Sequence, residues 1–171
     1  DAPTPVNLTS HAYFQLDGEQ GVRREWLMVV ADAVLAIRPD GIPTGELWQV
    51  AGTDFDYRAG RCLGWAVEST DPRLQAQRGL DHTYVLAEPG LAAQLTSADG
   101  SRVLSVSTDQ PGLQVYLSQW LEPQTGFQPY RAVCLEAQQF PDAPNHPNFP
   151  DTVITPTRPY HSRTLYRVDP A

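Results

Sequence analysis

Residues 132–150 read A-V-C-L-E-A-Q-Q-F-P-D-A-P-N-H-P-N-F-P, an order of residue types that predicts a buried strand followed by a rigid loop. The apolar run Val133, Cys134 and Leu135 leads to one carboxylate, Glu136, and prolines then recur at every third position from Pro141 onward. A carboxylate at the end of a buried strand loses hydration, which changes its proton affinity, and a rigid loop beside it can wall off a pocket. Glu136 is therefore a candidate site residue, although a strand-end glutamate paired with an arginine would give the same pattern.

The composition of the chain favours a single β-rich domain. Its 171 residues are 41% hydrophobic and include 12 glycines and 16 prolines. A chain of this length buries roughly 70% of its unfolded surface, which is enough for a real core. Because turn residues are frequent and helical periodicity is scarce, we predict an all-β fold of many short strands, with residues 1–171 forming one domain.

Charge and motif content argue against several classes of partner. The net charge is −8 and the 12 basic residues, all arginine, are scattered, so a nucleic-acid partner is not expected. No apolar run approaches the roughly 20 residues of a membrane span, and no signal-peptide pattern opens the chain. The two cysteines, Cys62 and Cys134, form no C-x-x-C motif, and the four histidines show no H-x-x-x-H spacing. Neither a disulfide framework nor a metal site is expected.

The most continuous apolar run, residues 26–37, is rich in valine and predicts a core strand or a pair of strands, although periodicity alone leaves a helix open. The composition of residues 17–21 predicts the turn of a hairpin. Further strands are expected at residues 46–50, 102–107 and 113–117, turns at residues 39–41, 42–45 and 108–112, and irregular structure from residue 51 through residue 80.

Three more polar residues are candidates for a site, namely Asp81, Gln114 and His11. Asp81 and His82 are adjacent at the start of an expected strand, so only one of them can point into a given pocket. Asp81 could accept hydrogen bonds from hydroxyl groups, or it could cap a turn beside a structural histidine. Gln114 offers both a donor and an acceptor, which suits sugar hydroxyls. His11 lies in an extended segment beside Tyr13, where a structural imidazole is the common case.

Five motifs, taken in order, resemble the C-terminal part of galactose mutarotases, the aldose 1-epimerase family, and together they cover almost the whole chain. They are N-L-T-S-H-A-Y-F-Q-L (7–16), I-P-T-G-E-L with V-A-G-T-D-F-D-Y-R (42–47 and 50–58), G-L-D-H-T-Y-V-L (79–86), T-D-Q-P-G-L-Q-V-Y (108–116) and C-L-E-A-Q-Q-F-P-D-A-P-N-H-P-N-F-P (134–150). The resemblance implies a β-sandwich of the mutarotase type, with a sugar in a cleft on one concave sheet and no cofactor.

By the matched motifs, the resemblance also implies roles for the candidates. Glu136 would be the general base that takes the proton of the anomeric hydroxyl, and His11 the general acid that protonates the ring oxygen. Asp81 and Gln114 would hold hydroxyls of a hexose such as galactose or glucose. Chemistry supports the pairing independently, because a carboxylate and an imidazole can remove and deliver protons near neutral pH.

Family members carry a further N-terminal part with an arginine and another histidine in the sugar site, and nothing in this chain corresponds to it. The resemblance therefore implies a C-terminal portion whose site is completed by a missing segment or a partner chain. A sandwich deprived of strands exposes apolar side chains and open sheet edges. A non-catalytic carbohydrate-binding module is the alternative, but pure binding does not require an acid and base pair. The cytoplasm is the expected compartment for a mutarotase of sugar catabolism.

Overall fold

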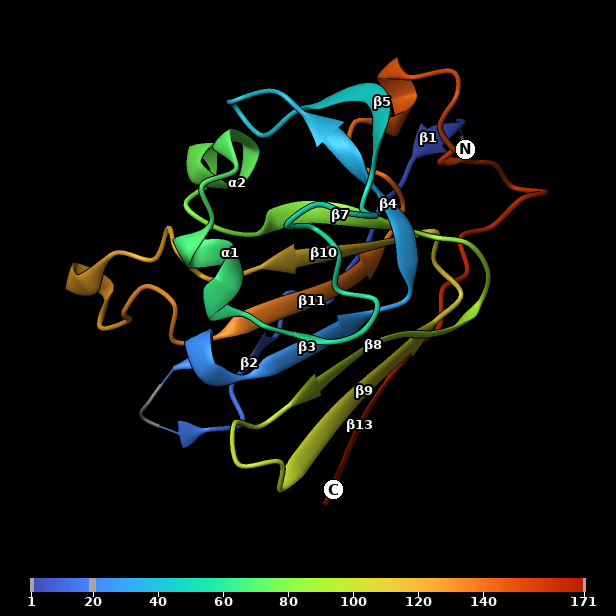
Figure 1. Ribbon diagram of the computed structural model, residues 1–171. Coiled ribbons are helices and arrows are strands. Elements are labelled where there is room, and N and C mark those ends of the chain that lie inside the picture. Colours follow the sequence, from blue (N-terminus) through green and yellow to red (C-terminus); the bar gives the residue numbers. More distant parts are fainter. Residues whose placement is uncertain (1, 19–20, 171) are drawn as a thin grey trace.

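The computed structural model describes residues 2–18 and 21–170, and within them two antiparallel sheets pack face to face (Figure 1). The strands are β1 (Thr4–Pro5), β2 (Tyr13–Phe14), β3 (Trp26–Val29), β4 (Ala31–Ile37), β5 (Pro43–Gln49), β6 (Arg61–Cys62), β7 (Asp81–Leu86), β8 (Gly90–Thr96), β9 (Arg102–Thr108), β10 (Gly112–Tyr116), β11 (Val133–Gln138), β12 (Val153–Ile154) and β13 (Thr164–Pro170). The helices are α1 (Gly64–Glu68) and α2 (Pro72–Ala76), with 3-10 turns η2 (Val22–Arg24), η3 (Pro123–Thr125) and η4 (Ala143–Asn145).

The larger sheet has the strand order β2-β11-β10-β7-β4-β5, the smaller one has the order β13-β9-β8-β3-β6, and β1 pairs with β12. The prediction of an all-β fold with large antiparallel sheets is confirmed. The prediction of strands at residues 102–107 and 113–117 is confirmed by β9 and β10, with a turn between them.

The core lies between the two sheets because successive side chains of a strand point to opposite faces. In β11, Val133 and Leu135 join the central apolar cluster, which also includes Leu104 and Val106 of β9 in the opposite sheet. Glu136 projects from the other face of β11. The outer face of the larger sheet is thus the surface on which its polar side chains gather.

The apolar run of residues 26–37 forms a pair of strands, as one of the two predictions for it stated. It crosses from β3 in the smaller sheet to β4 in the larger one, and the break falls at Val30. The helix alternative is wrong.

The turn expected at residues 17–21 is not the tip of a hairpin, because the flanking strands β2 and β3 belong to different sheets. Residues 19–20 themselves lie outside the described part.

Three other local predictions are wrong. Residues 42–45 largely belong to β5, which opens with Pro43, and the first position of a strand tolerates proline. Residues 51–80 contain β6, α1 and α2; Asp71 caps α2 by accepting the Arg73 N–H at 2.9 Å, and Pro72 follows the cap. Glu136 lies inside β11 and not at its end, because the ladder with β10 continues to Gln138.

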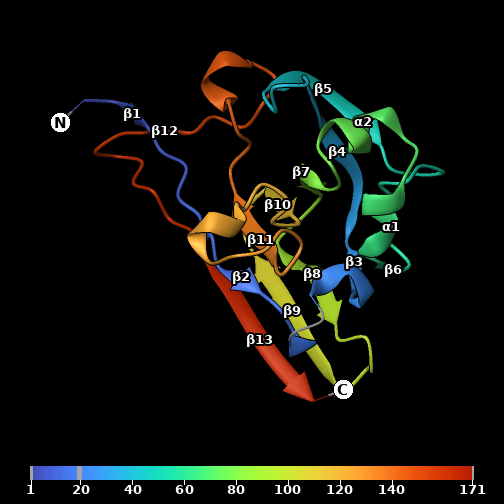
Figure 2. The ribbon, with the colours of Figure 1, turned by 90° about the vertical axis from the view of Figure 1, so that its left-hand side faces the viewer.

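Two strand edges open on the same side of the sandwich (Figure 2). Among the described residues β2 pairs only with β11, and β13 pairs only with β9. The two edges lie close together, since the rings of Phe14 and Tyr166 pack at 5.2 Å between centroids. Leu165 and Val168 of β13 are exposed nearby. An unpaired edge beside exposed apolar side chains is a surface to which further β-structure can pair.

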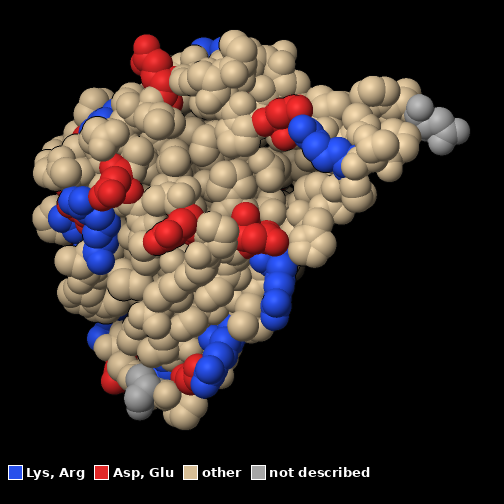
Figure 3. All heavy atoms as spheres, turned by 90° about the vertical axis from the view of Figure 1, so that its right-hand side faces the viewer, with Lys and Arg blue, Asp and Glu red and all other residues tan. Residues whose placement is uncertain are grey.

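Charged groups on the surface are dispersed. On the face shown in Figure 3, arginine side chains lie apart from one another, and several lie next to acidic side chains. Among the described residues, Arg58 contacts both Asp32 and Asp56. This face therefore carries no concentrated basic patch. In residues 2–18 and 21–170, no helix is long and apolar enough to cross a membrane.

A buried carboxyl group joins the two sheets near the start of β3. Glu25 is fully buried, and its Oε1 accepts the N–H groups of Leu16 at 2.7 Å and Asp17 at 3.0 Å. Burial raises the pKa of Glu25 to about 7, and the two backbone hydrogen bonds only partly oppose that rise. The segment after β2 is therefore fastened to β3 through a group that titrates near neutrality.

We predict that Glu25 makes the protein less stable as the pH rises. Its folded pKa of about 7 exceeds the reference value of 4.5, so the folded state keeps the proton after the unfolded state has lost it. As the pH rises from the reference pKa of 4.5 to the folded pKa of about 7, the free energy of unfolding decreases, by up to roughly 3 kcal/mol in total. Glu25→Gln keeps an oxygen acceptor and removes this contribution. Urea unfolding of both proteins at about pH 5 and about pH 8 measures the difference; equal pH dependence in the two would contradict it.

Candidate active site

The register of β7, β10 and β11 brings three of the predicted residues onto one face of the larger sheet. Gln114 lies opposite Glu136 on one side and opposite Thr83 on the other. Tyr116, two residues further along β10, lies opposite Asp81. Together these side chains line a cleft of about 460 Å³ on the outer face of the sheet.

His11 reaches this cleft through a segment that runs along β11. Asn7 donates to the carbonyl of Gln139 and accepts its N–H, at 3.1 and 2.9 Å, although the two residues are 132 positions apart. Thr9 Oγ1 donates to the carbonyl of Ala137 at 2.9 Å. The segment thereby places His11 Nε2 at 3.7 Å from Glu136 Oε1. The polar residues of N-L-T-S-H thus act as anchors for the histidine.

The environments of these two groups differ. The side chain of Glu136 is 8% exposed, whereas that of His11 is 52% exposed. Burial raises the pKa of Glu136, the His11 imidazole lowers it, and the charge of Asp81 raises it again. A carboxylate with a raised pKa is a stronger base than one in water, and its partner imidazole faces the cleft.

The other two predicted residues form a hydrogen-bonded row on the floor of the cleft. Thr83 Oγ1 donates to Gln114 Oε1 at 2.5 Å, and Gln114 Nε2 donates to Asp81 Oδ1 at 2.7 Å. Burial raises the pKa of Asp81, and hydrogen bonds from Gln114 and Trp120 oppose the rise. The row holds the Gln114 amide in one orientation, and it presents carboxylate and amide groups to a polar ligand.

His82 faces the opposite way from Asp81, as the alternation of a strand requires. It is fully buried, 4.8 Å from the ring of Phe55 and 6.3 Å from that of Trp48, and burial lowers its pKa to about 3. Its Nδ1 accepts the N–H of Asp81 at 3.1 Å. The prediction that only one of the adjacent pair enters a pocket is confirmed, and Asp81 is the one.

Several residues of the cleft were not predicted. Thr83, Tyr116 and Gln138 lie two positions from Asp81, Gln114 and Glu136, so the same alternation would have found them.

Trp120, which also lines the cleft, gives no such signal, because it follows β10 in an irregular segment. The Arg78 guanidinium packs over the Trp120 ring at 4.6 Å. The backbone N–H of Trp120 donates to Tyr116 Oη at 3.2 Å.

The proline loop forms another wall of the cleft, which includes Pro141. Phe140 and Phe149 pack edge to face at 5.1 Å and form a second small apolar cluster with Leu35 and Ala143 on the outer face of the sheet. The expectation that these two phenylalanines are packed is confirmed.

Known proteins resemble this chain in sequence and in fold. The family profile described as aldose 1-epimerase matches residues 1–167. The chain is 38% identical to an aldose 1-epimerase of Escherichia coli K12, over 98% of the chain and 51% of that protein. It is 35% identical to a galactose mutarotase of Bos taurus, over 96% of the chain and 50% of that protein.

The solved structure of a GalM/aldose epimerase homologue from C. elegans superposes with a TM-score of 0.87 at 27% identity, covering 99% of the chain and 53% of that protein. The structure of a galactose 1-epimerase from Lactobacillus acidophilus superposes with a TM-score of 0.82 at 27% identity, covering 99% of the chain and 50% of that protein.

The chain belongs to the aldose 1-epimerase family. Its fold is that of the galactose mutarotase-like sandwiches. The chain spans about half the length of the curated relatives that it matches.

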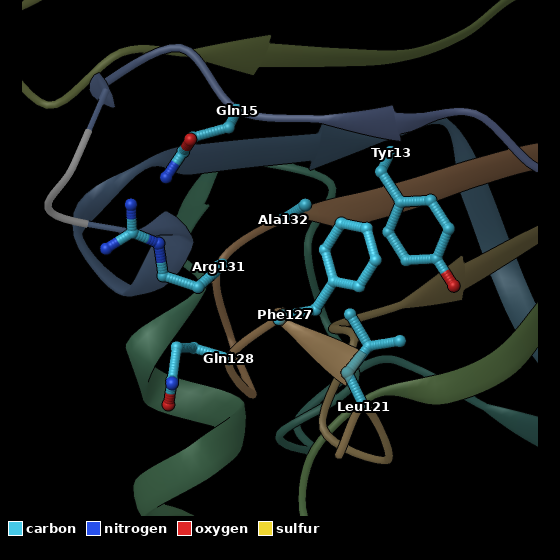
Figure 4. A pocket seen from close by; sticks show the side chains of 8 residues that line it. Tyr13, Gln15, Leu121, Phe127, Gln128, Arg131 and Ala132 are labelled. Carbon is cyan, nitrogen blue, oxygen red and sulfur yellow. The ribbon is translucent and has the colours of Figure 1, made fainter. Parts of the chain in front are cut away.

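Beside the cleft, this member of the aldose 1-epimerase family carries a second hollow of about 620 Å³. Figure 4 shows Tyr13, Leu121 and Phe127 grouped on one side of it, with Gln15 and Arg131 on the other. Phe127 is 62% exposed. Tyr13 lines both the cleft and this second hollow, which we call the groove around Phe127. The groove therefore borders the cleft at the edge strand β2.

We predict that Asn7→Ala releases the segment that carries His11. The Gln139 N–H then loses its acceptor, so its amide exchanges with solvent faster, and stability falls by about 1 kcal/mol. Hydrogen–deuterium exchange at Gln139 is the measurement. Asn148→Ala is the matched control, because Asn148 donates to the carbonyl of Gly45 instead. Unchanged exchange at Gln139 in Asn7→Ala would show that Asn7 is not an anchor.

Proposed function

We propose that the protein carrying this chain is an aldose 1-epimerase, an isomerase that interconverts the α and β anomers of a free hexose by acid–base ring opening. The observation that supports it best is the approach of His11 Nε2 to within 3.7 Å of Glu136 Oε1 over a cleft. The two groups come from segments far apart in the sequence, and the names of the relatives point to the same reaction.

In the proposed mechanism, Glu136 removes the proton from the anomeric hydroxyl while His11 delivers a proton to the ring oxygen. The pyranose opens to the aldehyde, and the C1–C2 bond rotates. The roles then reverse as the ring closes on the other face of the carbonyl. Ring opening and ring closure each couple proton transfer to the breaking or making of the C1–O5 bond. Burial of Glu136 supports its role as base, because it raises the pKa of the carboxyl group toward the working pH.

Asp81 and Gln114 are the groups that we propose hold sugar hydroxyls. A carboxylate accepts hydrogen bonds from hydroxyl hydrogens, and a glutamine amide both donates and accepts. Galactose is the first candidate substrate, because several curated relatives are named galactose mutarotase, and glucose is the second.

The open edges support a further proposal, that additional polypeptide completes the site. β2 and β13 offer unpaired edges on one side, and the groove around Phe127 borders the cleft there. Further strands, either in the same polypeptide or in a second chain, would cover the two unpaired edges and the groove. Native mass spectrometry of the protein from its own cells tests this: a longer chain or a second chain is expected. Without such a completion, a non-catalytic carbohydrate-binding module becomes the better description.

We propose the cytoplasm as the compartment, since the catabolism of free hexoses takes place there. Fractionation of the cells that make the protein, followed by an antibody against this chain, tests the location. Recovery outside the cytoplasmic fraction would contradict it.

We predict that Glu136→Gln and His11→Asn each slow mutarotation by about 10²- to 10⁴-fold, the usual contribution of one acid or base group. Polarimetry of freshly dissolved α-D-galactose and α-D-glucose gives the rate. His161→Asn serves as the matched control, because that imidazole is exposed and contacts Asp109 instead of the cleft. Rates in folded Glu136→Gln and His11→Asn that equal the parent rate would overturn the assignment.

A further inference from the structure

Three side chains of metal-ligating types meet at the cleft: His11 and Glu136 line it, and the fully buried Cys134 lies next to them. One ligand atom from each lies within 4.8 Å of the other two. The Sγ atom of Cys134 is 3.4 Å from Nδ1 of His11, and Oε1 of Glu136 is 3.7 Å from Nε2 of the same ring. Cys134 and Glu136 are two residues apart on β11, so both project from its outer face.

The spacing of Cys134 and His11 suits a bound metal ion as well as it suits the hydrogen bond between sulfur and nitrogen. Zinc binds sulfur at about 2.3 Å and imidazole nitrogen at about 2.0 to 2.1 Å, which puts the two atoms about 3.5 Å apart in tetrahedral geometry. The observed separation of Sγ and Nδ1 is 3.4 Å. One imidazole gives one nitrogen to a given ion, so the ion would take either Nδ1, which faces Cys134, or Nε2, which faces Glu136. With one atom from each residue, the three ligand atoms still lie within 4.8 Å of one another. The half-exposed ring of His11 is accessible to an ion arriving through the cleft.

The surroundings favour a cation. Asp81 lines the same cleft as Glu136, and Cys134 lies next to it, so three acidic groups share this region. Among the described residues that line the cleft, none is lysine or arginine. A cleft lined by groups of one sign concentrates ions of the other sign. Thiol, imidazole and carboxyl together form a donor set typical of zinc, which binds the thiol as thiolate and releases its proton.

We propose that His11, Cys134 and Glu136 bind a thiophilic divalent cation such as Zn²⁺, with the fourth position open to the cleft, and that the bound ion excludes the sugar. The ion would act as an inhibitor and not as a cofactor, because it engages the two side chains assigned to proton transfer. This second half rests on the proposed function, whereas metal binding does not. Since the two ligands compete, sugar weakens metal binding by the same factor as metal weakens sugar binding.

The direct test of binding uses Cd²⁺ as a probe, because a Cd²⁺–thiolate bond gives an ultraviolet charge-transfer band. The parent protein is compared with Cys134→Ser and with Cys134→Ala, so that one misfolded variant does not decide the result. Cys62→Ser is the matched control, since Cys62 contacts the carbonyl of Arg23 away from the cleft. We expect the Cys134-dependent band in the parent and in Cys62→Ser, and its loss in both Cys134 variants. A band that survives in the folded Cys134 variants overturns the site.

The second arm measures inhibition of mutarotation by Zn²⁺ in the same proteins. Because Cys134 contacts His11, the metal-free rate of each Cys134 variant is measured first, and the inhibition of the variants is expressed relative to that rate. They should need at least roughly 10-fold more Zn²⁺ for half inhibition, since even outer contacts of a metal site are worth 10- to 100-fold. Equal inhibition in parent and Cys134 variants overturns the proposed exclusion. If every protein lacks mutarotase activity, the proposed function fails, and the Cd²⁺ band still decides the metal site.

Discussion

The antiparallel ladder between β10 and β11 is the constraint on which the core and the cleft both depend. It sets Leu113 against Ala137 on the face toward the core and Gln114 against Glu136 on the face toward the cleft. A shift of this register by one residue would move the polar side chains into the core and the apolar ones into the cleft. The packing energy of the sandwich and the position of the candidate base are therefore fixed by the same backbone hydrogen bonds.

From this ladder the rest of the site is assembled by segments that attach to it. The N-terminal segment lies along β11 through Asn7 and Thr9 and brings His11 over the strand. The proline loop folds back on the outer face through Phe140 and Phe149. Burial under these segments raises the pKa of Glu136, so the carboxyl group suited to act as a base is also the one that the fold desolvates.

Much of this arrangement could be predicted where a local rule applies. Strand alternation accounts for β9 and for the choice between Asp81 and His82, and the run of residues 26–37 was recognisable as core strands. Strand β13 alternates in the same way, and Asp71-Pro72 marks a helix start, so both could have been found from their residues.

The contact of His11 with Glu136 has no local signal in residue chemistry, because strand order decides which distant segments meet. The resemblance to the aldose 1-epimerase family paired them, whereas the residues alone left His11 as a structural imidazole. The approach of Cys134 to His11 was missed for the same reason, since ligand spacing in the sequence does not report contacts between distant segments.

The central claim is that a hexose lies with its anomeric centre between Glu136 and His11. A crystal structure of the protein in complex with galactose tests it most directly. We expect the anomeric oxygen within about 2.6 to 3.2 Å of a Glu136 carboxyl oxygen and the ring oxygen at a similar distance from a His11 nitrogen. A sugar bound in the groove around Phe127, or bound in the cleft with C1 turned away from Glu136, would contradict it.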